Sequence, residues 1–299
     1  MKIFLSYDIT NNPCGGGNQF LRNLRDYLLR LDCLSTQPDC ADIILYNGHH
    51  MINETIQIKN TFPKKIFIHR MDGLQKLYNS ENDERQDIAI RFNKISNGTI
   101  FQSNWSKEKF KQYDFNPDNS VVIPNAADPS LFNTNYIKKQ SDKIKLLCTS
   151  FSPNLNKGFD FYKILDKELD FEKFDFTFVG NRPHNIHYKN IKCFTPETTT
   201  EISNRLKSTD IFVSATINDC CSNSIIEALS CGVPVLAKNS GGNPELVKQG
   251  GLCFDDFAEF MEKLETISKS LDLFRKNINI DMAEDVFLKY ISFFKKCIN

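Results

Sequence analysis

Short apolar runs alternate with amphipathic stretches along the chain, and this alternation predicts its secondary structure. In the first half, residues 2–6, 42–47, 65–69, 99–102 and 121–123 form apolar runs of strand length. The pattern restarts in the second half with residues 145–149, 176–179, 191–194, 211–214 and 233–237. Strands that alternate with helices predict a parallel sheet covered by helices, and the restart predicts two such α/β domains.

Two amphipathic helices and one polar stretch indicate how the domains are divided. Residues 18–31 place leucines and a phenylalanine on one side of a helix, and residues 282–298 form a similar helix near the end of the sequence. The polar stretch 133–143 is predicted to be the linker. We therefore expect an N-terminal domain at residues 1–138 and a C-terminal domain at residues 139–299.

Composition and charge exclude several classes of protein. The chain has 299 residues, of which 40% are hydrophobic and 25% charged, and its zero formal net charge argues against broad nonspecific binding to nucleic acid. No apolar run reaches about 18 residues, and the apolar start is too short for a signal peptide. The ten cysteines form no Cys-x-x-Cys pair. We expect a cytoplasmic protein with reduced thiols, no metal site and at most peripheral membrane contact.

The densest group of candidate site residues lies between positions 219 and 245. Ser222, Asn223 and Ser224 are good N-cap residues for the apolar helix that follows, which a glycine then ends. A strand of the buried parallel kind comes next, and Gly241 and Gly242 let the backbone approach whatever lies above that strand. A helix start aimed at the carboxyl edge of a parallel sheet is a ready site for an anion.

Glu227 lies one turn inside the same predicted helix. It shares a helix side with Asn223 and Ser224, away from the apolar side. A carboxylate there accepts hydrogen bonds from paired sugar hydroxyls of a ligand whose phosphate sits at the helix start. The alternative is an ordinary solvated glutamate.

This stretch resembles the donor-binding segment of glycosyltransferase family 4, in which two acids separated by seven residues precede a glycine turn and a further glutamate. Here the acids are Asp219 and Glu227, and Glu245 follows the glycine pair. Asp219 stands where the family usually has Glu, so its carboxylate is one methylene shorter. The resemblance extends over most of the chain. It implies the GT-B fold, two Rossmann-like parallel-sheet domains facing a cleft, in which the last helix (282–298 here) often crosses back to the N-terminal domain.

Two segments of the first half also resemble elements of this family. Residues 14–18 are a glycine loop before a helix, and Gly16 and Gly17 are candidates for contact with the sugar donor, the alternative being a tight turn. His69 begins a His-Arg-x-Asp-Gly segment at the end of a predicted strand, and the resemblance implies that it holds the transferred sugar. A structural histidine is the alternative. Arg70 and Asp72 are equally well interpreted as a structural pair that holds the loop.

The loop after the first strand of the second half resembles the family's pyrophosphate loop. The family places an Arg and then Lys-Gly there; Lys157 and Gly158 match, whereas Ser152 occupies the Arg position. A hydroxyl can donate one hydrogen bond to a phosphate but brings no charge. Arg182, in a later loop, is a candidate to supply that charge.

The resemblance implies a retaining transfer, with a hexose as the expected sugar, from a nucleotide-diphosphate sugar to an unidentified glycan, lipid or protein acceptor. Lys157 and the amides near Ser222–Ser224 would stabilise the departing diphosphate, and Glu227 would bind the ribose. Asp219 and His69 would hold the transferred sugar, assisted by amides near the glycine pair. The departing phosphate takes the acceptor's proton in this scheme, so no side-chain base is required. No cofactor is expected, and the lack of an Asp-x-Asp motif agrees with metal-independent chemistry.

Two other functions remain open at this stage. An epimerase or phosphorylase on the same frame would change the nucleotide sugar without the acceptor. A nucleotide-sugar-binding pseudoenzyme would bind it without turnover, and the departures at Ser152 and Asp219 make this alternative conceivable. A dehydrogenase is disfavoured because the glycine loop lacks the Gly-x-Gly-x-x-Gly spacing.

Overall fold

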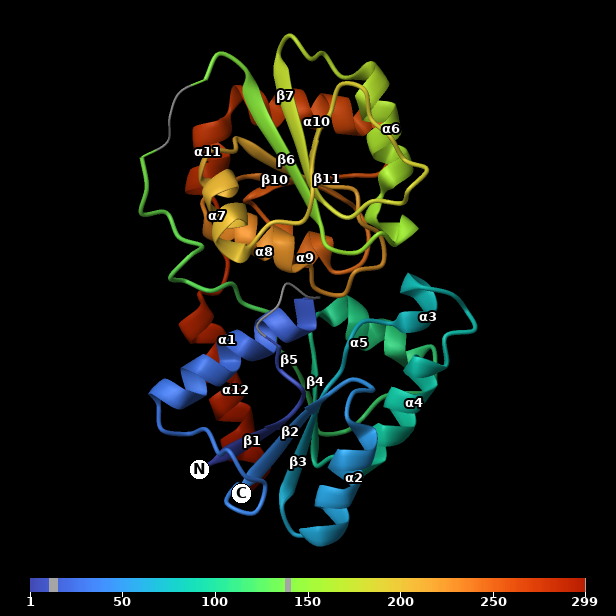
Figure 1. Cartoon of the computed structure of the whole chain (residues 1–299), viewed down its shortest axis with the longest axis vertical. Coiled ribbons are helices and arrows are strands. Elements are labelled where there is room, and N and C mark those ends of the chain that lie inside the picture. Colours follow the sequence, from blue (N-terminus) through green and yellow to red (C-terminus); the bar gives the residue numbers. More distant parts are fainter. Residues whose placement is uncertain (11–15, 138–140, 299) are drawn as a thin grey trace. The chain divides into compact units, whose positions relative to one another are not determined.

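A computed structural model describes residues 1–10, 16–137 and 141–298 of the chain. It divides into two compact units (Figure 1). Unit 1 holds the described residues of Met1–Asn12, Gly16–Asn125 and Ala283–Asn299, and unit 2 holds those of Ala126–Met282. The C-terminal helix therefore belongs to the same unit as the N-terminal strands.

Unit 1 is a five-stranded parallel sheet whose strand order follows the sequence. Its strands are β1 (Ile3–Ser6), β2 (Ile43–Asn47), β3 (Ile66–Arg70), β4 (Gly98–Phe101) and β5 (Ser120–Val122). Its helices are α1 (Gly16–Arg30), α2 (Ile52–Thr61), α3 (Gln75–Tyr78), α4 (Glu84–Phe92), the 3-10 turn η1 (Asn93–Ile95), α5 (Asn104–Lys111) and α12 (Ala283–Ile298).

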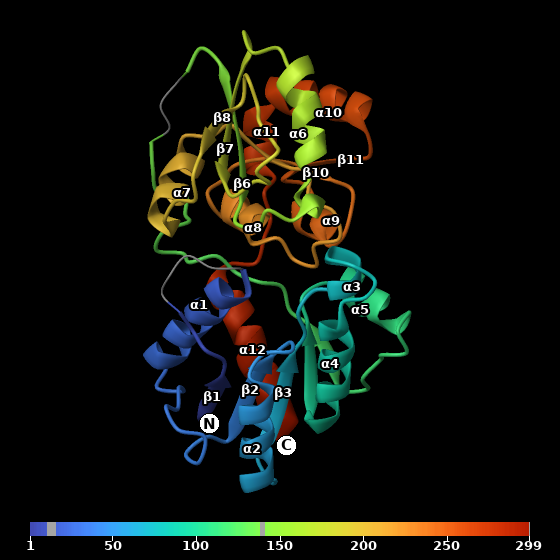
Figure 2. The same cartoon turned by 45° about the vertical axis from the view of Figure 1, so that its right-hand side comes forward.

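Helices α1 and α12 lie side by side against the sheet of unit 1 (Figures 1 and 2). The Phe287 ring of α12 packs on Phe20 and Tyr27 of α1, with ring centroids 5.9 and 4.9 Å apart. Beyond β1, the described residues of the unit add only a single bridge, from Ile3 to Leu34. The short connection between α1 and β2 explains this edge, because it leaves no room for a further strand.

Unit 2 is a six-stranded parallel sheet in the order β11-β10-β9-β6-β7-β8. Its strands are β6 (Ile144–Ser150), β7 (Phe174–Gly180), β8 (Lys192–Phe194), β9 (Ile211–Ser214), β10 (Val235–Lys238) and β11 (Gly251–Phe254). Its helices are the 3-10 turn η2 (Leu155–Lys157), α6 (Phe159–Glu168), α7 (Thr199–Lys207), α8 (Asn223–Ser230), α9 (Asn243–Val247), α10 (Phe257–Lys269) and α11 (Leu271–Lys276).

The strand order of unit 2 reverses between β6 and β9. Successive strands run outward in one direction from β6 and in the other from β9, which creates a topological switch point where ligands of doubly wound sheets bind. The apolar sides of α6 and α10 share one core with the sheet, and Phe161 of α6 stacks on Phe254 of β11 with ring centroids 4.9 Å apart. This core fixes the strand ends that carry the loops of the site.

The prediction of parallel α/β architecture is confirmed, and all ten predicted strands are present with small shifts at their ends. The eleventh strand, β11, is not among the predicted ones. Among the described residues, no helix is long and apolar enough to cross a membrane.

Candidate functional site

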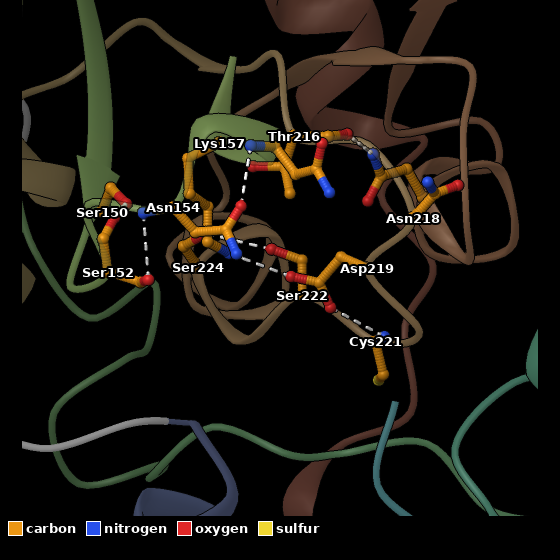
Figure 3. A network of polar contacts seen from close by, with 12 residues as sticks. Ser150, Ser152, Asn154, Lys157, Thr216, Asn218, Asp219, Cys221, Ser222 and Ser224 are labelled. Atoms are coloured by element: carbon orange, nitrogen blue, oxygen red, sulfur yellow. Dashed lines mark hydrogen bonds and ion pairs between the residues drawn. The ribbon is translucent and has the colours of Figure 1, made fainter. Parts of the chain in front are cut away.

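The candidate site of unit 2 lies at its switch point, where the loops after β6 and β9 meet (Figure 3). The amide of Ile217 donates to the carbonyl oxygen of Asn156 over 2.8 Å, which ties the two loops together. Gly158 has a φ of 85°, and a Cβ there would overlap Ala215. Only glycine therefore allows the β6 loop to lie this close to the end of β9.

Lys157 and Asp219 form an ion pair across these loops. The Lys157 Nζ lies 3.1 Å from Asp219 Oδ2, and each side chain is 18% exposed. The Asp219 Oδ1 accepts the amide of Cys221 over 3.1 Å, so both carboxylate oxygens are engaged. The sequence assigned these two residues to different parts of a ligand, whereas the structure makes them direct partners.

The predicted glycine turn packs against the backbone of Asp219. Gly241 has a φ of 64°, and a Cβ there would overlap the Asp219 carbonyl oxygen. The Gly242 amide donates to that same oxygen over 2.8 Å. The expectation that this amide assists a ligand therefore needs correction, because its hydrogen is already engaged within the protein. The turn positions the loop that carries Asp219.

The start of α8 follows directly, with Ser222 as its N-cap residue. The Ser222 side chain does not cap the helix; its Oγ lies 3.1 Å from Ser224 Oγ instead, as Figure 3 shows. Ser222 is buried, and Asn223 and Ser224 are half-buried. Amides at a helix start and the positive end of the helix dipole attract an anion. The structure places the helix start where the sequence predicted it, and the binding of an anion there stays a prediction.

Glu227 lies one turn into α8 and is half-buried. Burial raises the pKa of its carboxyl from an ordinary 4.5 to about 8. Within the described parts of the chain, this carboxyl has neither a hydrogen-bond nor an ion-pair partner. The structure thus excludes the alternative that Glu227 is an ordinary solvated glutamate. Its carboxyl lies beside the start of α8 and is available to a ligand.

The two other phosphate candidates are engaged within their own loops. The Ser152 Oγ accepts the amide of Asn154 over 3.2 Å. The Arg182 Nε donates to the Ile186 carbonyl over 3.0 Å, and the structure does not join Arg182 to the network around Lys157. Neither arrangement supplies the charge that the family's arginine would bring.

Asn243 is a supporting residue that the sequence analysis missed. It is fully buried, and its Nδ2 donates to the carbonyl oxygens of Thr216 and Lys238 over 3.0 and 3.1 Å. It thereby joins the loops that follow β9 and β10. The available signal was its position directly after the glycine pair and before a proline at the first turn of α9.

His69 in unit 1 requires a correction. It is 0% exposed, and its ring stacks on Tyr46 with centroids 4.3 Å apart. Its Nδ1 accepts from the Asn93 amide group over 3.0 Å, so the proton is on Nε2, which donates to the Gly48 carbonyl over 2.8 Å. Burial lowers its pKa to about 4. Both ring nitrogens are engaged in the core, so His69 is a structural residue and not a sugar ligand.

Of the predicted glycine loop, residues 14 and 15 lie outside the described residues. Gly16 begins α1, and a Cβ on Gly17 would be 3.8 Å from both Asn47 Nδ2 and Asp72 Oδ1. Gly17 therefore lies beside the carboxyl ends of β2 and β3. Its contact with a ligand stays a prediction.

Comparison with known proteins identifies the domain in unit 2. Residues 135–270 match the family model described as glycosyl transferases group 1. No curated protein sequence matches the chain. The prediction of a glycosyltransferase is confirmed at this group level, while membership of family 4 stays a prediction.

Solved structures match the chain along almost its whole length. HepE from Anabaena, crystallised with UDP and glucose, has a TM-score of 0.74 at 15% identity, with 99% of this chain and 100% of that chain covered. Sucrose-phosphate synthase from Thermosynechococcus elongatus has a TM-score of 0.76 at 12% identity, with 99% and 98% covered. AviGT4, from avilamycin A biosynthesis, has a TM-score of 0.71 at 15% identity, with 99% and 98% covered. These likenesses confirm the GT-B fold.

Proposed function

From the group 1 glycosyltransferase domain at residues 135–270, we propose that the chain transfers a hexosyl group from a nucleotide-diphosphate sugar to an acceptor hydroxyl. The anomeric configuration is retained, and no metal takes part in the transfer. UDP-glucose is the first sugar donor to test, because HepE was crystallised with UDP and glucose.

The observation that supports this proposal best is the arrangement of charges around the start of α8. Lys157 brings a cation to the loop after β6, and α8 presents its positive end beside Ser222 and Ser224. Glu227 follows one turn further on, with a carboxyl that has no partner among the residues that the structure describes. A diphosphate matches the first two features, and the ribose diol attached to it matches the third.

In the transfer, the bond between the anomeric carbon and the diphosphate oxygen breaks as the acceptor oxygen bonds to that carbon on the same face. The acceptor's proton passes to the departing phosphate oxygen. Negative charge grows on the diphosphate during this step, and Lys157 together with the α8 amides stabilises it. Because the phosphate takes the proton, no side-chain base is required.

Asp219 has two functions in this proposal. In the unliganded protein its carboxylate holds Lys157 in place at 3.1 Å and balances the lysine's charge. When a diphosphate enters, Lys157 turns its charge toward the phosphate oxygens, and the carboxylate then accepts a hydroxyl of the transferred sugar. The shorter side chain of Asp is compatible with this function because the glycine turn supports its backbone.

Calorimetric titration with UDP and UDP-glucose tests the ribose assignment. Glu227→Ala should weaken nucleotide binding about 10-fold, the loss expected when a hydrogen bond of about 1.5 kcal/mol to the buried carboxyl is removed. Glu262→Gln on α10 changes an exposed glutamate of the same unit and should leave affinity unchanged. Equal affinities for wild type and Glu227→Ala would show that the ribose lies elsewhere.

The same titration, combined with product analysis, separates the alternatives. Ser152 in place of the family's arginine is the observation that favours a binding module without turnover. Tight binding with no UDP release across an acceptor panel would support that reading. Conversion of the nucleotide sugar without any acceptor would support an epimerase.

A further inference from the structure

Three side chains converge outside the carboxyl ends of β2 and β3 in unit 1. His49 and His50 follow β2, and Asp72 follows β3. Each offers one ligand atom, and the three atoms lie within 4.8 Å of one another. Across the described ranges, this is the one group of three such side chains close enough to share a metal ion.

Hydrogen bonds fix the backbone turn at Gly48, directly before His49 and His50. Gly48 has a φ of 53°, and a Cβ there would overlap the Asp72 carboxylate. Its amide donates to the Arg70 carbonyl over 2.8 Å, and its own carbonyl accepts the His69 Nε2 hydrogen. The buried His69 thus fixes the turn from which His49 and His50 project.

Asp72 has one oxygen fixed and the other directed toward the imidazoles. Its Oδ1 accepts from Asn47 Nδ2 over 2.9 Å and lies 3.6 Å from Arg70 Nη1. Its Oδ2 lies 3.6 Å from His50 Nε2. Outer-shell bonds of this kind orient carboxylate ligands of metals. The Arg70 charge opposes a cation here, and the same guanidinium donates hydrogen bonds to Asn125 and Tyr290.

The two imidazoles are adjacent and only half-buried. Their rings stack with centroids 4.4 Å apart, and Tyr7 packs edge-on against His50 at 5.1 Å. Within the described residues, the His49 ring has no hydrogen-bond partner. A ring nitrogen of His49 is therefore available to a ligand.

We propose that His49, His50 and Asp72 bind one divalent transition-metal ion of the Zn²⁺, Ni²⁺ or Co²⁺ class. Metal–nitrogen and metal–oxygen bonds of about 2 Å place neighbouring ligand atoms roughly 3–4 Å apart, which agrees with the His50–Asp72 distance of 3.6 Å. Two imidazoles with one carboxylate select these ions over Mg²⁺ and Ca²⁺, which prefer oxygen ligands. Water completes the coordination. The site shares no residue with the proposed transfer chemistry. An experiment can therefore refute one of the two proposals without refuting the other.

Titration of the full-length, tag-free, reduced and nucleotide-free chain with Co²⁺ and Ni²⁺ tests this site. Calorimetry should show one ion per chain, and Co²⁺ should show visible ligand-field absorption. His49→Gln and His50→Gln should each weaken binding at least about 100-fold, the upper end of what outer-shell changes cost. Thermal melts without metal check that both variants are folded.

The chain supplies a matched control. His184 and His187 are a pair of exposed histidines in unit 2, and the double variant His184→Gln/His187→Gln should bind both ions as the wild type does. Three results would overturn the proposal: no binding by the wild type, unchanged binding in folded His49→Gln and His50→Gln, or a thiolate-to-Co²⁺ charge-transfer band. The last would assign the ion to cysteines.

Discussion

At the scale of single residues, Glu227 shows how strongly burial changes one carboxyl group. Its pKa of about 8 means that the folded chain binds a proton here that the unfolded chain has already released above pH 4.5. Stability contributed by this proton is present below pH 4.5, decreases as the pH rises to about 8, and is lost above that.

Glu227→Gln removes this pH dependence. The melting temperature of the variant minus that of the wild type should increase steadily between pH 5 and pH 8 and level off above it. Calorimetric melts in the absence of nucleotide measure the difference. A difference that stays constant over this range would show that the Glu227 carboxyl titrates normally.

Lys157 is expected to affect turnover far more than stability. Lys157→Ala removes a cation from a partly shielded ion pair, which costs about 1 kcal/mol of unfolding free energy. Stabilisation of the leaving diphosphate is lost as well, and turnover should decrease about 100-fold. Lys163→Ala, which breaks an exposed pair with Asp160, is the control and should retain wild-type turnover. Equal rates for the two variants would remove Lys157 from the mechanism.

The sequence identified the types of the site residues better than their environments. Asp219, Lys157 and Glu227 were predicted as separate candidates, and the structure shows that two of them pair and the third is isolated. His69 was misassigned because burial depends on contacts distant in sequence, here with Tyr46 and Asn93. No local pattern distinguishes it from a histidine that faces a ligand.

At the scale of elements, the site depends on loops that glycines hold against strand ends. Gly158 and Gly232 both adopt positive φ, at 85° and 70°, but their surroundings differ. A Cβ at position 158 would overlap Ala215, whereas one at 232 would meet only the Thr134 methyl group at 3.1 Å. Alanine substitutions at the two positions therefore distinguish the cost of backbone strain alone from the cost of strain combined with movement of the Lys157 loop.

Gly232→Ala should cost about 1–2 kcal/mol of stability from the left-handed backbone alone and leave turnover nearly unchanged. Gly158→Ala adds a clash that moves the Lys157 loop away from β9, so it should destabilise the chain further and reduce turnover at least 10-fold. Denaturant unfolding together with initial rates measures both effects. Similar turnover in the two variants would contradict the close packing described for Gly158.

Strands were predicted well because buried parallel strands are apolar runs with polar ends. The prediction failed at β11, a four-residue strand in which one glycine and one cysteine dilute the apolar signal. A Cβ on Gly251 would overlap the backbone of Val235, so glycine is required at that position by the neighbouring strand and not by its own propensity. A single sequence does not show which strands are neighbours, so it cannot predict this requirement for glycine.

At the scale of the whole molecule, α12 joins the two ends of the chain within unit 1. Its Tyr290 hydroxyl accepts a hydrogen bond from Arg70 Nε over 3.2 Å, and Arg70 is fully buried. The Arg70 guanidinium also faces the Phe20 ring, 4.7 Å from its centroid. The amphipathic pattern of residues 282–298 predicted the helix, but only the fold shows that it covers a buried charge.

A chain that ends at Met282 tests whether nucleotide binding resides in unit 2 alone. Without α12, unit 1 exposes Phe20 and loses the Tyr290 hydroxyl that accepts from Arg70, and each large apolar side chain that becomes exposed costs about 1.5–3 kcal/mol. Hydrogen exchange should therefore show rapid exchange throughout β1–β5, while β6–β11 stay protected. The residues proposed to bind the nucleotide all lie in unit 2, so UDP affinity should stay within a few-fold of the wild type. Tyr290→Phe, which keeps the helix and removes one hydroxyl, should leave unit 1 folded. Loss of UDP binding from the truncated chain with β6–β11 still protected would place part of the nucleotide site on unit 1 and contradict the proposed assignment.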